Sequence, residues 1–207
     1  MITERFNEPD NIEIIRDQMA GIIALEMDKQ YEMAIDDDDP VASDFLARVL
    51  VENDEPLNAG GDNVDIFPLI NVSVDSRSLV DGTSAVNYDK AQATVFVDCY
   101  QIGNNSGIFA GRKATIKAWK LARCVRRILR SDYYKYLRLR GVVSDVKIAN
   151  MKAGVPAMND SAIMVVLVRL SVDVVFDEAA PIVKGESLEL IPVQISDENG
   201  QVVVDIK

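Results

Sequence analysis

Residues 111–140 read GRKATIKAWKLARCVRRILRSDYYKYLRLR and begin with a strong helical pattern. From about Arg112 to Arg130, apolar residues recur at the 3.6-residue spacing of an α-helix. This apolar arc consists of Ala114, Ala118, Leu121, Ala122, Val125, Ile128 and Leu129. The other side is basic and consists of Arg112, Lys113, Lys117, Lys120, Arg123, Arg126, Arg127 and Arg130. The pattern predicts an amphipathic helix with its apolar side on a core and a basic side turned away from it.

The same stretch separates the charges of the chain. It holds 11 of the 22 Lys and Arg residues and one acid, Asp132, which leaves 11 basic and 32 acidic residues elsewhere. Such separation predicts a molecule with two unlike surfaces. The formal net charge of −11 argues against a protein that reads DNA sequence, because such proteins usually present net positive charge.

Two residues depart from the amphipathic pattern. At 100° per residue, Ile116 and Trp119 project among the basic side chains. Neighbouring Lys and Arg side chains could cover them. Alternatively, they belong to a second buried face that binds another chain, since Trp and Arg are common at interface centres. On this second interpretation, the predicted subunit interface consists of Arg112, Ile116, Trp119, Lys120, Arg123, Arg126 and Arg127.

Composition excludes several classes of protein. The chain of 207 residues is 48% hydrophobic, which is enough for a core in one large domain or two small ones. It has no apolar run near the roughly 18 residues of a membrane span, and its acidic start is unlike a signal peptide, so we expect a soluble protein made in a cytoplasm. The absence of histidine removes His-based triads and metal ligands. Cys99 and Cys124 form no CxxC motif and are expected to be free thiols.

A helix and an acidic tract are predicted before the sheet. Asn7 or Asp10 can cap a helix that runs to about Lys29. Its apolar stripe consists of Ile12, Ile15, Met19, Ile22, Ile23 and Met27. Four adjacent carboxylates follow, Asp36, Asp37, Asp38 and Asp39, and then Pro40. We interpret this tract as a solvated loop; a Mg²⁺ or Ca²⁺ site is the alternative, but the ligand spacing of an EF-hand is missing.

Strands are predicted at 45–51, 66–74, 91–100, 142–149 and 161–176. In the longest of them, every second residue from Met164 to Phe176 is apolar, whereas the reverse face becomes polar from Arg169 onward. Asp75, Asp98 and Asp173 fall on the wetter faces of their strands and form an acidic surface if those strands lie close together. Tyrosines and cations alternate at 131–140, a pattern that suits nucleic-acid binding or, as we favour, the packing of a helix end or a subunit contact.

The order of these elements predicts an α+β fold in which two helices pack on one face of a mainly antiparallel β-sheet. We expect residues 1–180 to form this domain, with an acidic loop insertion at 36–63, and residues 181–207 to form a C-terminal β-hairpin arm. Two apolar runs flank Asn199-Gly200, a strong hairpin signal. Because both faces of the hairpin are apolar, it should dock either on its own domain or on the sheet edge of a neighbour.

The chain resembles a known family over about residues 10–180. The residues that carry the resemblance are FPLINVSVDS, AQATVFVDCYQ, AWKLARCVRRIL, YYKYLRLRGVV and AIMVVLVRLSVDVVFDEAAP, in this order after an N-terminal helix. Together they resemble the tail terminator (tail completion) proteins of long-tailed bacteriophages. The resemblance implies a structural virion protein without a cofactor or enzymatic activity. It implies a hexameric ring, assembled in the host cytoplasm, that caps the tail tube and joins it to the neck or head.

The implied partners are copies of the chain itself, the tail tube protein, a neck or connector protein and the tail sheath, with DNA passing through the lumen. A lumen with carboxylates would repel phosphates. The residues expected on an acidic lumen or partner face are Asp36, Asp37, Asp38, Asp39, Asp75, Asp98 and Asp173. The alternatives are a head–tail adaptor or another neck or baseplate ring subunit, and a metal-dependent hydrolase. The hydrolase would require Asp75, Asp98, Asp145 and Asp173 to converge on cations.

Overall fold

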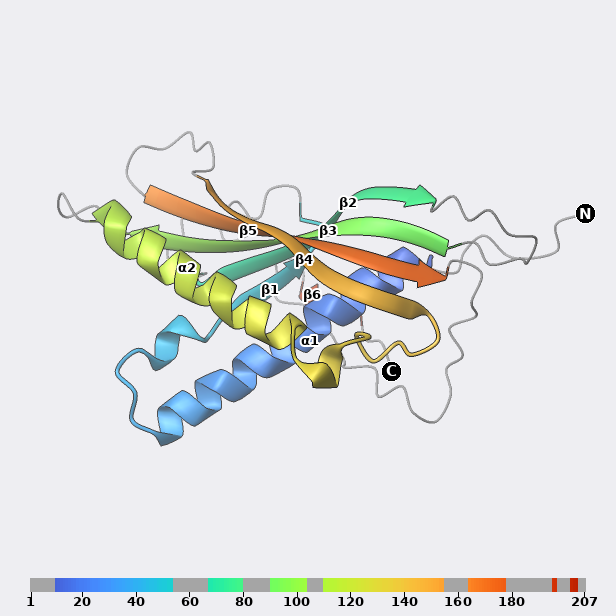
Figure 1. Ribbon diagram of the computed structural model, residues 1–207. Helices are drawn as coiled ribbons and strands as arrows, with labels where there is room; N and C mark the ends of the chain where they lie inside the picture. The colour runs from blue at the N-terminus through green and yellow to red at the C-terminus, as the bar shows by residue number, and fades with distance from the viewer. Residues whose placement is uncertain are drawn as a thin grey trace, which may run out of the picture.

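The computed structural model describes residues 10–53, 67–79, 90–103, 110–154, 164–177, 195–196 and 202–204. Within these residues, two α-helices, α1 (Asn11–Asp36) and α2 (Ala110–Leu129), lie on one face of a five-stranded sheet (Figure 1). The strands are β1 (Arg48–Val51), β2 (Leu69–Leu79), β3 (Lys90–Gly103), β4 (Val143–Gly154) and β5 (Met164–Asp177), and their order in the sheet is β1-β2-β3-β5-β4. β1 runs parallel to β2, and the other neighbouring pairs are antiparallel. The predicted α+β fold is therefore confirmed.

Helix α1 begins where the capping signal places it and ends later than predicted. The backbone N–H of Asp10 donates to Glu13 Oε2 at 3.0 Å, which fixes the start of the helix. The helix continues past Lys29 to Asp36 because no Gly or Pro interrupts this segment. Asp36 is thus the last helical residue rather than part of a loop, which corrects the prediction. The predicted apolar stripe of α1 is buried in the core.

The main core lies between the helices and the sheet. The apolar arc of α2 is buried as predicted, apart from the half-buried Ile128. It packs against the alternate residues of β3 and β5 that point to this side, including Val97, Leu170 and Phe176. The period-two alternation of these strands therefore identified the core face correctly.

Strand boundaries differ from the predictions where pairing overrides the local sequence. The strand predicted at 142–149 is too short, because residues 150–154 pair with 167–171 of β5 and extend β4. The extended strand tolerates Asn150 and Gly154 at the edge of the sheet, with register shifts in its ladder. Conversely, β1 starts only at Arg48, because a 3₁₀ turn, η1 (Ala42–Asp44), occupies the segment before it.

The sheet face without helices is only partly polar. Leu50, Leu69, Tyr100 and Val165 form a second buried cluster on this face, and Phe67, Ile102 and Leu167 pack against it. The prediction of a wetter face is therefore right for the half of the sheet around Ser171 and Asp173, and wrong for the half around Tyr100.

The C-terminal arm is described only at its two short strands. β6 (Ile195–Ser196) pairs antiparallel with β7 (Val202–Val204), as the predicted hairpin requires. The predicted domain boundary at 180, the docking of the arm and residues 54–63 of the predicted acidic insertion lie outside the described residues.

Candidate subunit-interaction surfaces

The basic face of α2 is exposed over its whole length. Its exposed cations are Arg112, Lys113, Lys117, Arg123, Arg126, Arg127 and Arg130. Arg126 and Arg127 lie in the last turn, where the helix dipole favours positive charge. Arg112 and Lys113 lie near the start of the helix, where the dipole disfavours it. The predicted separation of a basic face from an apolar face is confirmed.

The two out-of-pattern residues of α2 have different environments. Ile116 is 56% exposed, as its position among the basic residues predicts. Trp119 is half-buried and packs against the main core. The expectation that Trp119 projects away from the core is therefore wrong.

One predicted interface residue is used inside the subunit. Asp44 of η1 has a side chain that is 10% exposed, and it pairs with Lys117 Nζ at 2.9 Å and Lys120 Nζ at 3.4 Å. The Lys120 ammonium also lies 4.8 Å from the centre of the Phe45 ring. Lys120 therefore ties the connection between α1 and β1 to α2. The remaining predicted interface cations, Arg112, Arg123, Arg126 and Arg127, make no ion pair with a described residue.

The acidic tract lies at the end of α1. Asp36, Asp37 and Asp38 are exposed, whereas Asp39 is half-buried and its Oδ1 accepts a hydrogen bond from the Val41 N–H at 3.0 Å. The last turn of α1 contains no basic residue. Because the helix dipole places partial negative charge at this end, the tract adds like charge to like charge. This end of α1 is therefore strongly electronegative.

The predicted acidic face of the sheet is not formed as expected. Asp98 is 2% exposed, and Arg169 binds it through two hydrogen bonds of 2.7 Å, Nε to Oδ1 and Nη2 to Oδ2. The Arg169 guanidinium also stacks over Phe96 at 4.1 Å. The Asp98 carboxylate is thus buried and neutralised, and it contributes little to the surface.

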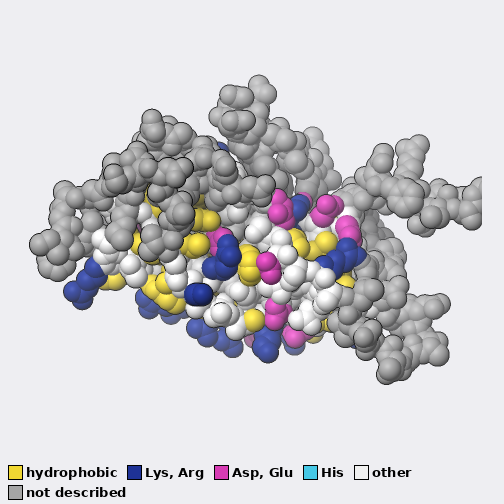
Figure 2. All heavy atoms as spheres, turned by 90° about the horizontal axis from the view of Figure 1, so that it is seen from above, with side chains coloured by type: hydrophobic (Ala, Val, Ile, Leu, Met, Phe, Trp, Pro, Cys, Tyr) yellow, Lys and Arg dark blue, Asp and Glu magenta, His cyan; other side chains and the backbone are white. Residues whose placement is uncertain are grey.

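The other two sheet aspartates are at least partly exposed. Asp173 is half-buried, accepts a hydrogen bond from Thr94 Oγ1 at 2.9 Å and is opposite Lys147 of β4. Asp75 is exposed on β2. In Figure 2, the side of the molecule away from α1 shows Lys and Arg interspersed with Asp and Glu. The described part of this face therefore carries mixed charge.

No metal site is found among the described residues: no three or more Cys, Asp and Glu side chains lie close enough together to hold an ion. In particular, Asp98 faces Arg169, and the exposed Asp145 lies on the edge strand β4. The four carboxylates of the hydrolase hypothesis do not converge.

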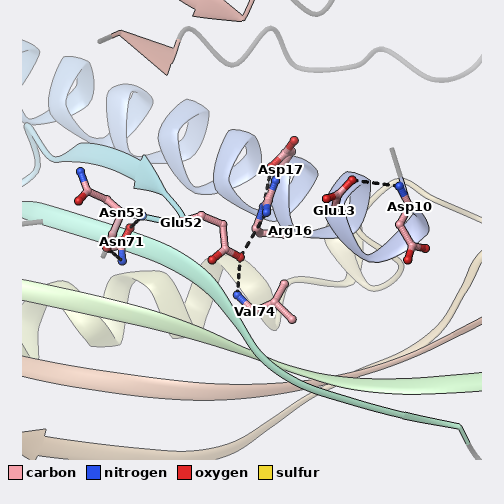
Figure 3. Close-up of polar contacts among 8 residues, drawn as sticks. All are labelled: Asp10, Glu13, Arg16, Asp17, Glu52, Asn53, Asn71 and Val74. Atoms are coloured by element: carbon pink, nitrogen blue, oxygen red, sulfur yellow. Dashed lines mark hydrogen bonds and ion pairs between the residues drawn. The ribbon is translucent and has the colours of Figure 1, made fainter. Parts of the chain in front are cut away.

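A polar seam joins α1 to the edge of the sheet, and it was not predicted from the sequence (Figure 3). Glu52, which follows β1 with a φ of 47°, accepts a hydrogen bond from the Val74 N–H at 2.7 Å and pairs with Arg16 at 3.2 Å. Asn53 and Asn71 exchange hydrogen bonds of 3.2 and 3.0 Å beside it. The Glu52 side chain therefore satisfies a strand N–H of β2 at the point where β1 ends. The only hint of this seam in the sequence is that two polar residues, Glu52 and Asn53, directly follow an apolar strand.

The Tyr-rich segment after α2 packs the end of the helix. Tyr134, in the 3₁₀ turn η3 (Asp132–Tyr134), is buried and donates a 2.6 Å hydrogen bond to Glu26 Oε1 of α1. Burial and this hydrogen bond raise the pKa of Tyr134 to about 12. Burial acts to raise the pKa of Glu26, but hydrogen bonds from Lys29 and Tyr134 outweigh it and lower that pKa below its ordinary value. For Tyr134, the packing interpretation of this segment is confirmed.

Comparisons with known proteins do not assign this chain to a family. Neither the scan against protein-family models nor the search of curated proteins gives a match. Among the described residues, neither α1 nor α2 is sufficiently long and apolar to cross a membrane.

Proposed function

We propose that this protein is a structural subunit of a phage tail or neck. It forms a hexameric ring that caps the tail tube and joins it to the neck, and DNA passes through the lumen. The observation that carries the proposal is the exposed basic face of α2 with Ile116 on it, combined with an exposed acidic end of α1 on the same subunit. A ring built head-to-tail requires two unlike patches on each subunit, and this molecule has such a pair.

The charged and the apolar side chains at the subunit contact would contribute different amounts of binding free energy. An exposed ion pair contributes about 0–1 kcal/mol, so the basic face would orient the subunits rather than hold them together. Burial of apolar surface contributes about 25 cal/mol per Å², so exposed aliphatic side chains such as Ile116 would supply more of the holding energy. The implied partners are copies of the chain, the tail tube protein and a neck or connector protein, together with the sheath where the tail has one.

The lumen should repel DNA, since affinity for DNA comes mainly from cations that neutralise phosphates. The buried ion pair of Asp98 makes this residue unsuitable for the role. Asp75 is exposed and Asp173 is partly exposed, so these two residues remain our candidates for the channel wall.

The assembly state of the purified protein tests the proposal. We expect native mass spectrometry to give six copies, and negative-stain imaging to show rings that bind one end of added tail tubes. A protein that stays monomeric, alone and with tubes, would refute the proposed function. Rings that bind an isolated connector but ignore tail tubes would replace it with a head–tail adaptor.

A substitution on α2 tests the location of the interface. Ile116→Gln keeps a good helix former and removes an exposed apolar side chain, so we expect weaker assembly with an unchanged circular dichroism spectrum. Trp119→Ala is less informative, because Trp119 also packs against the main core and its loss should reduce stability as well. A ring of undiminished stability in Ile116→Gln would exclude this residue from the contact.

A further inference from the structure

Two helix ends carry charges of the sign that the helix dipole disfavours. Helix α1 ends with Asp36, is capped by Asp37 and is followed by Asp38, with no basic residue in its last turn. Helix α2 starts at Ala110 and carries Arg112 and Lys113 close to this N-terminus. Its first turn contains no acidic residue. Negative charge at a C-terminus and positive charge at an N-terminus both destabilise a helix. Both ends would be more stable in the isolated subunit with the opposite charges.

These charges are not compensated by other described residues. No hydrogen bond or ion pair with a described residue involves the side chains of Asp36, Asp37 and Asp38, or those of Arg112 and Lys113. Their neighbours do have partners. Asp39 accepts a hydrogen bond from the Val41 N–H, and Lys117 and Lys120 both pair with Asp44. What distinguishes the two helix ends from other exposed charges, such as Arg126 and Arg127, is that their uncompensated charges also oppose the helix dipole.

Each helix end also has exposed aliphatic side chains. Met33 and Ile35, 57% and 52% exposed, lie in the last turns of α1 beside the acidic residues. On α2, Ile116 is 56% exposed and lies three and four residues after Lys113 and Arg112, so the three share one helix face. Apolar groups with a charged rim are the usual composition of an interface. The two surfaces match in apolar character and are opposite in charge.

We propose that the C-terminal end of α1, Met33 to Asp38, packs against the N-terminal part of α2, Arg112 to Ile116, of a second copy of the chain. The inference rests on the proposed function, in which the chain forms a ring, and it names the two surfaces that meet. The contact would place Arg112 and Lys113 beside the negative end of α1, and Asp36 and Asp37 beside the positive end of α2. It therefore removes both mismatches at once. Because the two surfaces differ, each subunit can bind one neighbour through α1 and another through α2, and such a head-to-tail contact can close a ring.

Charge reversal tests this pairing without threatening the fold. The acid-reversed variant is Asp36→Lys/Asp37→Lys, and the base-reversed variant is Arg112→Glu/Lys113→Glu. Each places the favoured charge at its helix end, so at a protein concentration low enough to keep all proteins monomeric we expect thermal midpoints equal to or above that of the wild type. The matched controls reverse exposed charges elsewhere, in Asp132→Lys/Asp145→Lys and Arg140→Glu/Lys152→Glu. Native mass spectrometry at low ionic strength gives the assembly state of each protein alone and of the two test variants mixed in equal amounts.

We expect each test variant alone to lose the ring, because like charges then meet at every contact, and both controls to keep it. The equimolar mixture should recover rings with equal numbers of the two variants, since an alternating arrangement places opposite charges at every contact. Half of these contacts have the wild-type charges, and the other half have the exchanged charges. If the wild type forms rings and each test variant alone also forms rings, this pairing is overturned and the proposed function stands. A mixture that does not recover rings would overturn the pairing as well. A wild-type protein that forms no ring would instead refute the proposed function.

Discussion

Replacement of Arg169 by Met should destabilise the fold strongly, even though the side chain of Arg169 is 41% exposed. Its partner Asp98 has a side chain that is only 3% exposed. The substitution keeps the stem of the side chain and removes the cation. Asp98 would then retain one hydrogen bond, from Tyr100 Oη at 3.4 Å.

The magnitude follows from the burial of the two partners. Removal of one partner of a buried ion pair costs about 3–5 kcal/mol, because the other charge stays buried and unpaired. Water can reach the exposed side of the Arg169 site, which places the cost near the lower limit. The lost stacking on Phe96 adds about 0.5–1 kcal/mol. We therefore expect a loss of about 3.5–4 kcal/mol and, for a chain of this size, a fall in Tm of about 7–16 °C.

Urea unfolding followed by circular dichroism measures this loss as a lower midpoint at an unchanged m-value. The protein concentration must give the same oligomeric state for every variant, because assembly adds to apparent stability. Lys152→Met is the matched control. Lys152 is opposite Arg169 on β4 and is exposed, so its free energy of unfolding should change by less than about 0.5 kcal/mol.

The double variant Asp98→Asn/Arg169→Met separates the orphaned charge from lost packing. Removal of the buried charge should recover at least about 1 kcal/mol relative to Arg169→Met alone. A stability of Arg169→Met within about 0.5 kcal/mol of the wild type would refute the reasoning. So would a double variant that recovers nothing.

Three further predictions concern the core, the α1–β1 connection and the contact between the helices. Phe176→Ala should cost about 3–5 kcal/mol in urea unfolding, because the ring is fully buried; a cost below about 1 kcal/mol would contradict its place in the core. Asp44→Asn should cost about 1 kcal/mol at low salt, and this difference should shrink as NaCl is added, since it reflects ion pairs with Lys117 and Lys120, whose side chains are 49% and 36% exposed. Glu26→Gln should cost about 0.5–1 kcal/mol at neutral pH. The pKa of Glu26 in the folded state lies below its unfolded value of 4.5. The contribution of the Glu26 carboxylate to the free energy of unfolding is therefore complete above pH 4.5 and is lost as the pH falls through the folded-state pKa. The urea unfolding curves of the wild type and Glu26→Gln should accordingly converge in acid.

The sequence predicted the elements and their buried faces because these depend on local periodicity. The spacing of Leu121, Val125 and Leu129 identified the core side of α2, and the alternation of Val95, Val97 and Cys99 identified that of β3. Separation of the charges was likewise visible in the sequence, because it requires only a count. The sequence also placed Ile116 correctly on the exposed face.

The partners of the polar residues could not be predicted, because they come from distant parts of the chain. Arg169 reaches Asp98 across 71 residues, and only the register of β3 against β5 brings them opposite each other. The same holds for Lys120 with Asp44, 76 residues apart.

The sequence by itself thus determined which face of each element is apolar and where the positive charge lies. The tertiary structure alone decided which of these charges are neutralised, as at Asp98, and which are left without a described partner, as at Asp36 and Arg112. The physical reason is that periodicity acts over a few residues of one helix or strand, whereas a hydrogen bond or an ion pair depends on the position of two elements in space.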